Sequence, residues 1–200
     1  KNCGVYSPKW IGKCPSCGSW NSYVEEIVGK EPSNKIFIAG LEPQKQKPIL
    51  ISDVEALNEP RIDTHNNELN RVLGGGLVGG SLVLIGGEPG IGKSTLVLQT
   101  VLNLQQKRTL YISGEESVQQ LKLRAERLGY QNPDCYVVSE TSLEQVFVHV
   151  QNIKPDVLIV DSIQTITTEL VESSPGSVSQ VRECAAALLK FCKTTGTPVL

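Results

Sequence analysis

The sequence has no methionine, few aromatic residues and no marked excess of charge of either sign. A formal net charge of −2 gives no bulk electrostatic reason to bind nucleic acid, although a local basic stripe could still do so. The apolar runs are far shorter than the roughly 18 residues of a membrane helix, and we do not expect Lys1 to begin a secretory signal. We therefore expect a cytoplasmic protein. Because methionine is missing even at position 1 and the last residues read as the start of a buried strand, we expect both ends to be cropped.

Three regions of the chain differ in composition. Residues 1–28 are rich in Cys, Gly and Trp, whereas residues 29–62 are richer in Pro and Lys and show little periodicity. From residue 63 to residue 200, short apolar runs alternate with amphipathic segments. We predict a small N-terminal module over 1–28, a linker over 29–62 and one larger domain over 63–200.

The larger region predicts an α/β fold. Five short apolar runs indicate strands, and they cover residues 81–87, 108–114, 134–140, 155–162 and 197–200. Strands that are buried on both faces and separated by helices favour a mainly parallel sheet with right-handed crossovers.

Local signals mark the ends of the expected helices. The first helix is predicted over Ser94–Gln106, directly after a glycine-rich segment. Three later helices each open with S-x-x-Q, at Ser117–Gln120, Ser142–Gln145 and Ser177–Gln180, which predicts three capping boxes. Gly129 is expected to end the first of these three helices in a left-handed conformation.

The six cysteines fall into two groups. Three lie in apolar surroundings and are expected to be core thiols: Cys135, Cys184 and Cys192. The other three are Cys3, Cys14 and Cys17, of which the last two form a C-x-x-C pair followed by glycine. This spacing is typical of structural zinc sites, which bind four thiolates, so a set of three leaves surface thiols as an alternative.

Residues 87–94 match the phosphate-binding pattern G-x-x-x-x-G-K-[ST] without a mismatch. Gly90 and Gly92 would let backbone N–H groups approach a phosphate chain, Lys93 would reach the outer phosphates, and the Ser94 hydroxyl would hold Mg²⁺. An ordinary glycine-rich turn would not explain Lys and Ser at these two positions. The predicted nucleotide-binding residues are Gly87, Glu88, Pro89, Gly90, Ile91, Gly92, Lys93 and Ser94.

Carboxylates follow two of the predicted strands. Asp161 ends the run "DVLIV" and is expected at the carboxyl edge of the sheet as a second Mg²⁺ anchor, although it could merely cap a turn. Glu115 and Glu116 emerge at the same edge. We expect Glu115 to polarise the attacking water. The alternatives are Glu116, or two acidic residues that only favour the start of a helix.

Several longer segments resemble the bacterial RadA (Sms) family of DNA-repair proteins, within the RecA-like ATPase superfamily. They are "LNRVLGGGLVGGSLVLIGGEPGIGKSTLVLQ", "YISGEES", "RAERLG", "DVLIVDSIQT" and "SPGSVSQVRECAAALL". The resemblance implies a zinc-ribbon-type finger and a RecA-like ATPase core, with a Lon-protease-like domain absent from this chain. It implies a hexameric, ATP-driven motor on single-stranded DNA that helps RecA to branch-migrate recombination intermediates.

The same resemblance assigns roles to residues. Gly87 to Thr95 fall on the Walker A motif, Asp161 on Walker B, and Glu115 on the catalytic glutamate, so the implied cofactors are ATP, Mg²⁺ and Zn²⁺. Family fingers begin with C-x-x-C, which implies that a fourth zinc ligand lies one residue before Lys1.

A long polar stretch after Asp161 is the expected DNA contact. The resemblance implies that residues 165–179, with Gln180 and Arg182, face single-stranded DNA in the channel of the ring. The residues themselves offer little support, because Glu169 and Glu172 are acidic and Arg182 is the only basic residue nearby. A solvated connector remains the alternative.

Two other functions fit the phosphate-binding pattern. A KaiC-like ring ATPase would use ATP hydrolysis to time its rearrangement without moving DNA, but such proteins lack an N-terminal zinc finger. A small-molecule kinase would need phosphate-clamping arginines, and no Arg cluster lies between Ser113 and Leu200.

Overall fold

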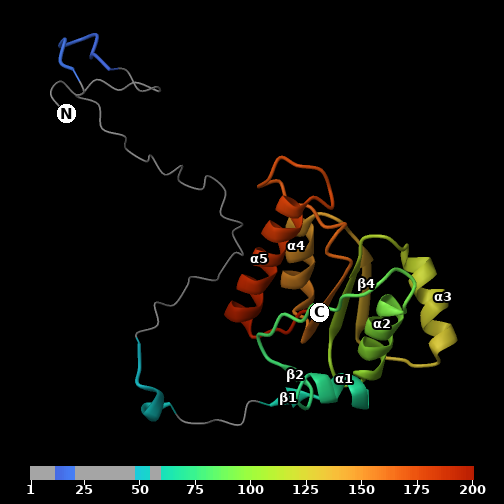
Figure 1. Ribbon diagram of the computed structural model, residues 1–200. Helices are drawn as coiled ribbons and strands as arrows, with labels where there is room; N and C mark the ends of the chain where they lie inside the picture. Colours follow the sequence, from blue (N-terminus) through green and yellow to red (C-terminus); the bar gives the residue numbers. More distant parts are fainter. Residues whose placement is uncertain (1–11, 21–47, 55–59) are drawn as a thin grey trace. The chain divides into compact units, whose positions relative to one another are not determined.

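The computed structural model describes residues 12–20, 48–54 and 60–200 (Figure 1). The chain divides into two compact units, Lys1–Lys35 and Ile36–Leu200. Most of the predicted linker lies outside the described residues, and its limits stay a prediction. None of the helices in the described ranges is both long and apolar enough to cross a membrane.

The centre of the larger unit is a parallel three-stranded sheet. Its strands are β3 (Thr109–Ser113), β4 (Cys135–Ser139) and β5 (Val157–Asp161), in the order β4-β3-β5. All five residues of β3 are buried, as expected for a central strand. In this register Ser113 pairs with both Ser139 and Asp161, so the three strands end at one edge.

The two remaining predicted strands extend this sheet beyond β5 but are shorter than expected. Val199 bridges both Leu158 and Leu82 in parallel. The N–H of Leu200 donates to the Leu158 carbonyl at 3.0 Å, and the N–H of Val83 donates to the Val199 carbonyl at 2.8 Å. Residues 197–200 therefore lie between β5 and the segment that leads into the glycine-rich loop. The predicted mainly parallel α/β sheet is confirmed.

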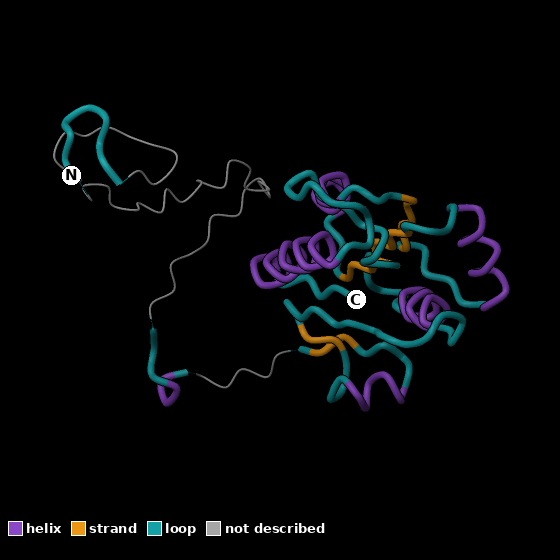
Figure 2. Tube along the Cα trace, turned by 45° about the horizontal axis from the view of Figure 1, so that its top comes forward, coloured by secondary structure: helices purple, strands orange, loops and turns teal. Residues whose placement is uncertain are grey.

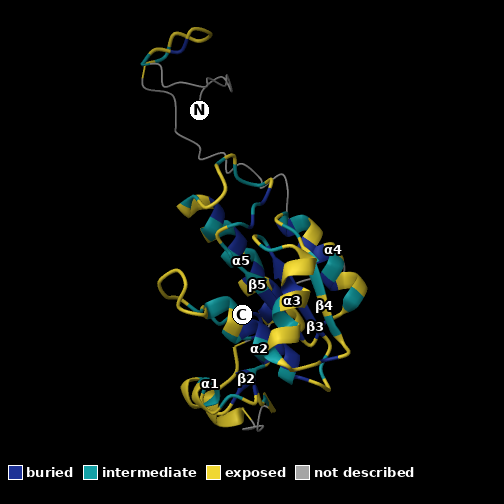
Figure 3. Cartoon of the chain, turned by 90° about the vertical axis from the view of Figure 1, so that its right-hand side faces the viewer, coloured by how far each residue is buried: buried dark blue, intermediate teal, exposed yellow. Residues whose placement is uncertain are grey.

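Helices cover both faces of the sheet (Figures 1 and 2). The main helices are α2 (Lys93–Asn103), α3 (Val118–Leu128), α4 (Leu143–Ile153) and α5 (Val178–Thr195). Leu110 and Ile112 of β3 pack in a cluster with α4 and α5, whereas Tyr111 packs in a second cluster with α2 and α3. This alternation along β3 gives three layers, and Figure 3 shows the buried strands between the helices.

The N-termini of three helices confirm the predicted Ser caps but correct two of the capping boxes. Ser117, Ser142 and Ser177 each accept a hydrogen bond from the backbone N–H three residues later. Only at α3 does the Gln side chain bond back to the cap. At α4, Glu140 takes that role and accepts from the N–H of Ser142 at 2.8 Å. At α5, the side chain of Gln180 has other partners, described below.

Smaller elements complete the larger unit. β1 (Arg61–Ile62) pairs antiparallel with β2 (Leu77–Val78), so the last two residues of the predicted linker form a strand. A short helix, α1 (Asn67–Val72), lies between these strands, and η1 (Ile51–Asp53) is a single 3₁₀ turn.

The predicted core thiols and the predicted helix end are found in this unit. Cys184 and Cys192 are fully buried, and Cys135 is partly buried beside the α2–α3 cluster. Burial raises the pKa of all three thiols, that of Cys184 to about 11. Gly129 ends α3 with φ of 72°, as predicted.

Candidate nucleotide site

The glycine-rich loop connects the segment around Leu82 to α2. Its residues are exposed, and α2 begins at Lys93 immediately after it. Gly90 and Gly92 have φ angles of 81° and 101°, a region that residues with a Cβ rarely adopt. The two glycines therefore permit a turn that leads the chain directly into the first turn of a helix, where free backbone N–H groups favour an anion.

Lys93 joins the two ends of this loop. Its ammonium group donates hydrogen bonds to the carbonyls of Gly87 at 2.9 Å and Glu88 at 2.8 Å. Ser94 and Thr95 follow in the first turn of α2. The cation, the first helical N–H groups and two hydroxyl residues thus belong to one short segment, which suits a phosphate chain and its metal.

Asp161 ends β5 and is hydrogen-bonded across the sheet. The phenol of Tyr111 donates to Asp161 Oδ2 at 2.5 Å. Burial, followed by this hydrogen bond and the charge of Asp161, raises the pKa of Tyr111 well above its usual range. The phenol consequently stays protonated and acts as the donor to the carboxylate.

The two adjacent glutamates have different partners. Glu115 Oε1 accepts a hydrogen bond from the hydroxyl of Ser162 at 3.0 Å, next to Asp161. Glu116 instead forms an ion pair with Arg124 of α3, with 2.8 Å between Oε1 and Nη2. The carboxylate of Glu115 is therefore tied to the end of β5, whereas that of Glu116 is tied to α3.

Gly114 is a site residue that sequence reasoning missed. Its N–H donates to the carbonyl of Asp161 at 2.9 Å, and a Cβ placed there would come within 1.7 Å of Thr165 Oγ1. Only glycine lets the chain after β3 approach the chain after β5 this closely. The sequence does show a glycine between a predicted strand and a predicted capped helix, but it does not show that this glycine meets Thr165.

The long segment between β5 and α5 is held by buried side chains, which alters the interpretation of Gln180. Gln180 is 3% exposed, its Oε1 accepts from the N–H of Thr168 at 2.9 Å, and its Nε2 donates to the carbonyls of Thr168, Val171 and Ser173. Because this amide is buried and bonded to its own chain, the expected direct contact of Gln180 with DNA is not available in this structure. Arg182 is exposed.

Glu144 of α4 anchors the same segment. It accepts hydrogen bonds from the Thr168 hydroxyl at 2.6 Å and from the N–H of Glu169 at 3.2 Å. Burial alone would raise the pKa of Glu144, but these bonds and one from Ser142 together hold it below its ordinary value. Residues 162–177 are therefore attached to α4 and α5 by specific bonds, near the amino ends of both helices (Figure 1).

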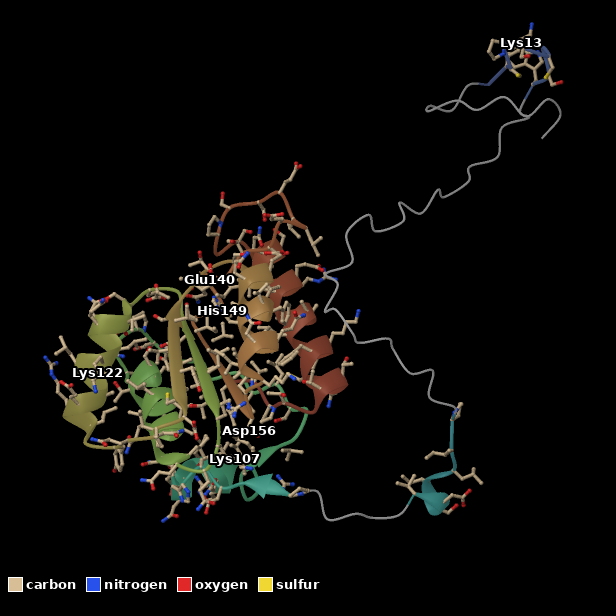
Figure 4. The ribbon with its side chains drawn as sticks, turned by 180° about the vertical axis from the view of Figure 1, so that it is seen from behind. Lys13, Lys107, Lys122, Glu140, His149 and Asp156 are labelled. Carbon is tan, nitrogen blue, oxygen red and sulfur yellow. The ribbon has the colours of Figure 1, made fainter. Side chains whose placement is uncertain are left out.

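A cavity of about 980 Å³ lies away from the residues just described. It is lined in part by Lys107, Asp156 and Pro198, which precede β3, β5 and Val199 (Figure 4). These positions are the amino ends of the parallel strands, whereas ligands of such sheets bind at the carboxyl ends. We therefore do not assign the nucleotide to this cavity.

In the N-terminal unit, the described residues 12–20 form a tight turn. The N–H of Cys14 donates to the Ser19 carbonyl and the N–H of Gly18 donates to the Cys14 carbonyl, both at 2.9 Å. Gly18 has a φ angle of 70°. The ammonium group of Lys13, a residue labelled in Figure 4, lies over the ring of Trp20. A C-x-x-C turn ending in glycine fits a zinc-binding knuckle.

The zinc prediction as a whole is not tested by the structure. Cys3 lies outside the described residues, and no group of three His, Cys, Asp or Glu side chains suited to a metal occurs within 12–20, 48–54 and 60–200.

The glycine loop leads directly into a helix, and Asp161 ends a strand at the same end of the parallel sheet, with one strand between the two. This arrangement defines a P-loop nucleotide-binding protein. Comparison with known families specifies the class further. Residues 47–200 match the AAA domain family, and residues 1–25 match the family described as a rubredoxin metal binding domain. The chain therefore belongs to the AAA domain family of ATPases.

Individual relatives agree with this assignment. The chain is 54% identical over 202 residues to the DNA repair protein RadA of Bacillus subtilis (strain 168), which covers 100% of this chain and 44% of that protein. It is 51% identical over 193 residues to the DNA repair protein RadA of Listeria monocytogenes serovar 1/2a (strain EGD-e), covering 96% and 42%. The resemblance to the RadA family is confirmed, and the chain spans less than half the length of these relatives.

A solved structure supports the fold. The KaiC-like protein PH0186 from Pyrococcus horikoshii OT3 matches with a TM-score of 0.58 and 19% identity, over 70% of this chain and 68% of that one. With the metal-binding family at the N-terminus, this likeness confirms the expected RecA-like α/β core preceded by a zinc-ribbon-type module.

Proposed function

We propose that this chain is the ATP-hydrolysing part of a protein that moves along single-stranded DNA during recombinational repair. The observation that carries the proposal is the sheet edge at which Tyr111 holds the Asp161 carboxylate and the adjacent Ser162 holds that of Glu115, in a chain that also has a complete phosphate-binding loop. The relatives named DNA repair protein RadA, which match the full chain, support the link with DNA.

The proposed roles follow from the contacts of each residue. The loop from Gly87 to Thr95 binds the phosphates through its N–H groups and Lys93, whose ammonium group exchanges its two loop carbonyls for phosphate oxygens. Ser94 and Asp161 would hold Mg²⁺, which when bound neutralises charge that develops on the phosphates. Oxygen donors of this kind are the ligands that Mg²⁺ prefers.

Glu115 is proposed to orient the water that attacks the γ-phosphate. Its carboxylate accepts only the Ser162 hydroxyl among the described residues, so it keeps oxygen lone pairs for a water molecule. Glu116 is less suited, because its carboxylate is engaged by the Arg124 guanidinium. Lys93 and Glu115 would thus be the catalytic residues.

The DNA contact is proposed for the exposed surface of residues 165–179 and for Arg182 at the start of α5. Gln180 would contribute indirectly by holding this segment from within. Branched recombination intermediates and RecA are the proposed partners, and a homo-hexamer in the cytoplasm is the proposed assembly. The KaiC-like neighbour supports this assembly only as a relative in fold.

Zn²⁺ is proposed to be bound by Cys3, Cys14 and Cys17, with a fourth thiolate from outside this sequence. The turn at residues 14–19 and the metal-binding family match over 1–25 support this site. The same match favours the DNA motor over a KaiC-like timing ATPase.

The test is ATP turnover by the full-length natural protein with and without single-stranded DNA. We expect DNA to accelerate phosphate release several-fold, and Lys93→Ala to abolish release under both conditions. If DNA leaves turnover unchanged while Lys93→Ala still abolishes it, the motor is wrong and the timing ATPase is favoured. Arg182→Ala should weaken DNA binding and lower the slope of its salt dependence by about 1, without changing turnover in the absence of DNA.

A further inference from the structure

Tyr111 has a polar atom in an otherwise aliphatic environment. It is the central residue of β3, is 0% exposed, and packs in the cluster that includes Leu98, Val157 and Ile159. A phenylalanine would fill this space as well, and it would leave no polar atom to satisfy. The hydroxyl is matched by a single acceptor, Asp161 Oδ2. Packing alone therefore does not explain why this residue carries a hydroxyl group.

The register of the sheet explains why the two side chains meet. Tyr111 pairs with Ile159 of β5, and Asp161 lies two residues further along the same strand. Residues two apart in a strand face the same side of a sheet, so Asp161 shares the face of Tyr111 and Ile159. That is the face covered by α2, the helix that begins with Lys93 and Ser94.

The hydrogen bond restrains one oxygen of the carboxylate and leaves the other. Among residues 60–200, Oδ1 of Asp161 has no hydrogen-bond donor, whereas Oδ2 is held at 2.5 Å. A carboxylate at a strand end can otherwise rotate about its last side-chain bond, because such torsions are broad. A buried, immobile phenol removes this freedom.

We propose that Tyr111 is a positioning residue that orients the Asp161 carboxylate so that Oδ1 is presented to the magnesium ion of the bound nucleotide. This inference rests on the nucleotide site of the proposed function. Tyr111 itself would touch neither nucleotide nor metal. Its effect would be confined to the metal, since the phosphate loop and Lys93 make no contact with its hydroxyl in this structure.

Tyr111→Phe is the decisive variant because it removes one oxygen and keeps the ring. Tyr136→Phe is the matched control, since Tyr136 lies on the neighbouring strand β4, is 45% exposed and has no bond to Asp161. The full-length protein and both variants would be titrated with a fluorescent ATP analogue, in EDTA and at increasing Mg²⁺ concentration. Thermal unfolding of each protein would show that it is folded.

We expect Tyr111→Phe to raise the Mg²⁺ concentration for half-maximal tightening of nucleotide binding by about tenfold. In EDTA its nucleotide affinity should equal that of the wild type, and Tyr136→Phe should match the wild type in both conditions. An unchanged Mg²⁺ requirement in Tyr111→Phe would overturn the inference. So would an equal loss of affinity with and without Mg²⁺, which would mean that the hydroxyl serves packing.

A double-mutant cycle with Asp161→Asn provides a second test of the inference. Asp161→Asn should raise the Mg²⁺ requirement by itself, and adding Tyr111→Phe to it should raise the requirement no further. Additive effects would contradict a role through Asp161. If the wild type binds no nucleotide at all, the proposed function fails and the inference falls with it, whereas Mg²⁺-dependent binding that is unaffected by Tyr111→Phe overturns the positioning role alone.

Discussion

The loop at residues 87–92 and the segment at residues 162–177 both leave strands at the carboxyl edge of the sheet, but they are held in different ways. The first depends on glycine φ angles and on Lys93, all within a few residues of one another. The second is held by Gln180 and Glu144, which come from two helices and bond to its backbone. The first kind of loop can be recognised from a short pattern, whereas the second cannot.

This difference changes what a long polar segment implies. Its length favoured a functional loop or a solvated connector, and the resemblance to the RadA family implied a contact with DNA. The structure instead shows Thr168 and Ile166 buried within it, and four hydrogen bonds to the amide of Gln180. A ligand would therefore meet the outer surface of an anchored segment, whose position depends on α4 and α5.

The largest effect is expected at the nucleotide edge. Glu115→Gln keeps the size of the side chain and removes its ability to accept a proton from water. ATP hydrolysis by the full-length protein should fall by about 10²- to 10⁴-fold, while ATP binding is retained. Glu116→Gln is the control, because it removes an ion pair with Arg124 and should alter hydrolysis far less. Equal losses in the two variants would contradict the assignment.

The contact between the second region and the chain that follows β3 should be the next most sensitive. Gly114→Ala places a Cβ against Thr165, and we expect the free energy of unfolding to fall by about 3 kcal/mol. Thr165→Gly in the same chain removes the atoms that overlap and should restore part of this loss. Chemical denaturation measures both, and a destabilisation that Thr165→Gly leaves untouched would locate the strain elsewhere.

Gln145 and Gln180 have the same place in S-x-x-Q, but Gln180 bonds to a distant segment whereas Gln145 is exposed. Gln180→Ala leaves buried backbone groups without partners and should lower the free energy of unfolding by about 2 kcal/mol. Gln145→Ala, at an exposed position of α4, should change it by less than about 0.5 kcal/mol. Similar losses in denaturant titrations would show that Gln180 acts only as a helix-start residue.

The smallest effect near neutral pH concerns Cys184, whose thiol donates to the carbonyl of Ile166 at 3.6 Å. Burial, aided by the carboxylates of Glu144 and Glu183, raises the pKa of this thiol from 9.0 to about 11. The unfolded chain therefore releases its proton first, and stability that is present below pH 9 is lost as pH rises toward 11. The wild type should lose about 1 kcal/mol more per pH unit than Cys184→Ala in this range. Parallel pH profiles would contradict the shift.

Much of the fold could be predicted because its signals are local or periodic. The apolar runs identified β3, β4, β5 and the two segments that bridge beyond β5, but not the short pair β1–β2. The Ser residues at 117, 142 and 177 located three helix starts. The carboxylate pair after β3 was also visible. Which of the two lies beside Asp161 could not be predicted, because it depends on tertiary contacts. Ser162 bonds to Glu115, whereas Arg124 pairs with Glu116.

The sequence by itself determined the phosphate loop, the parallel α/β core and the candidate carboxylates. In each case the requirement concerns neighbouring residues: a φ angle, a hydrophobic period or a residue at the end of a strand. Only the tertiary structure decided that Tyr111 holds Asp161, that Gly114 meets Thr165 and that Gln180 is buried. These contacts join residues that are 12 to 51 positions apart in the chain. Sheet register and packing determine which residues meet, and a local sequence pattern contains no information on either.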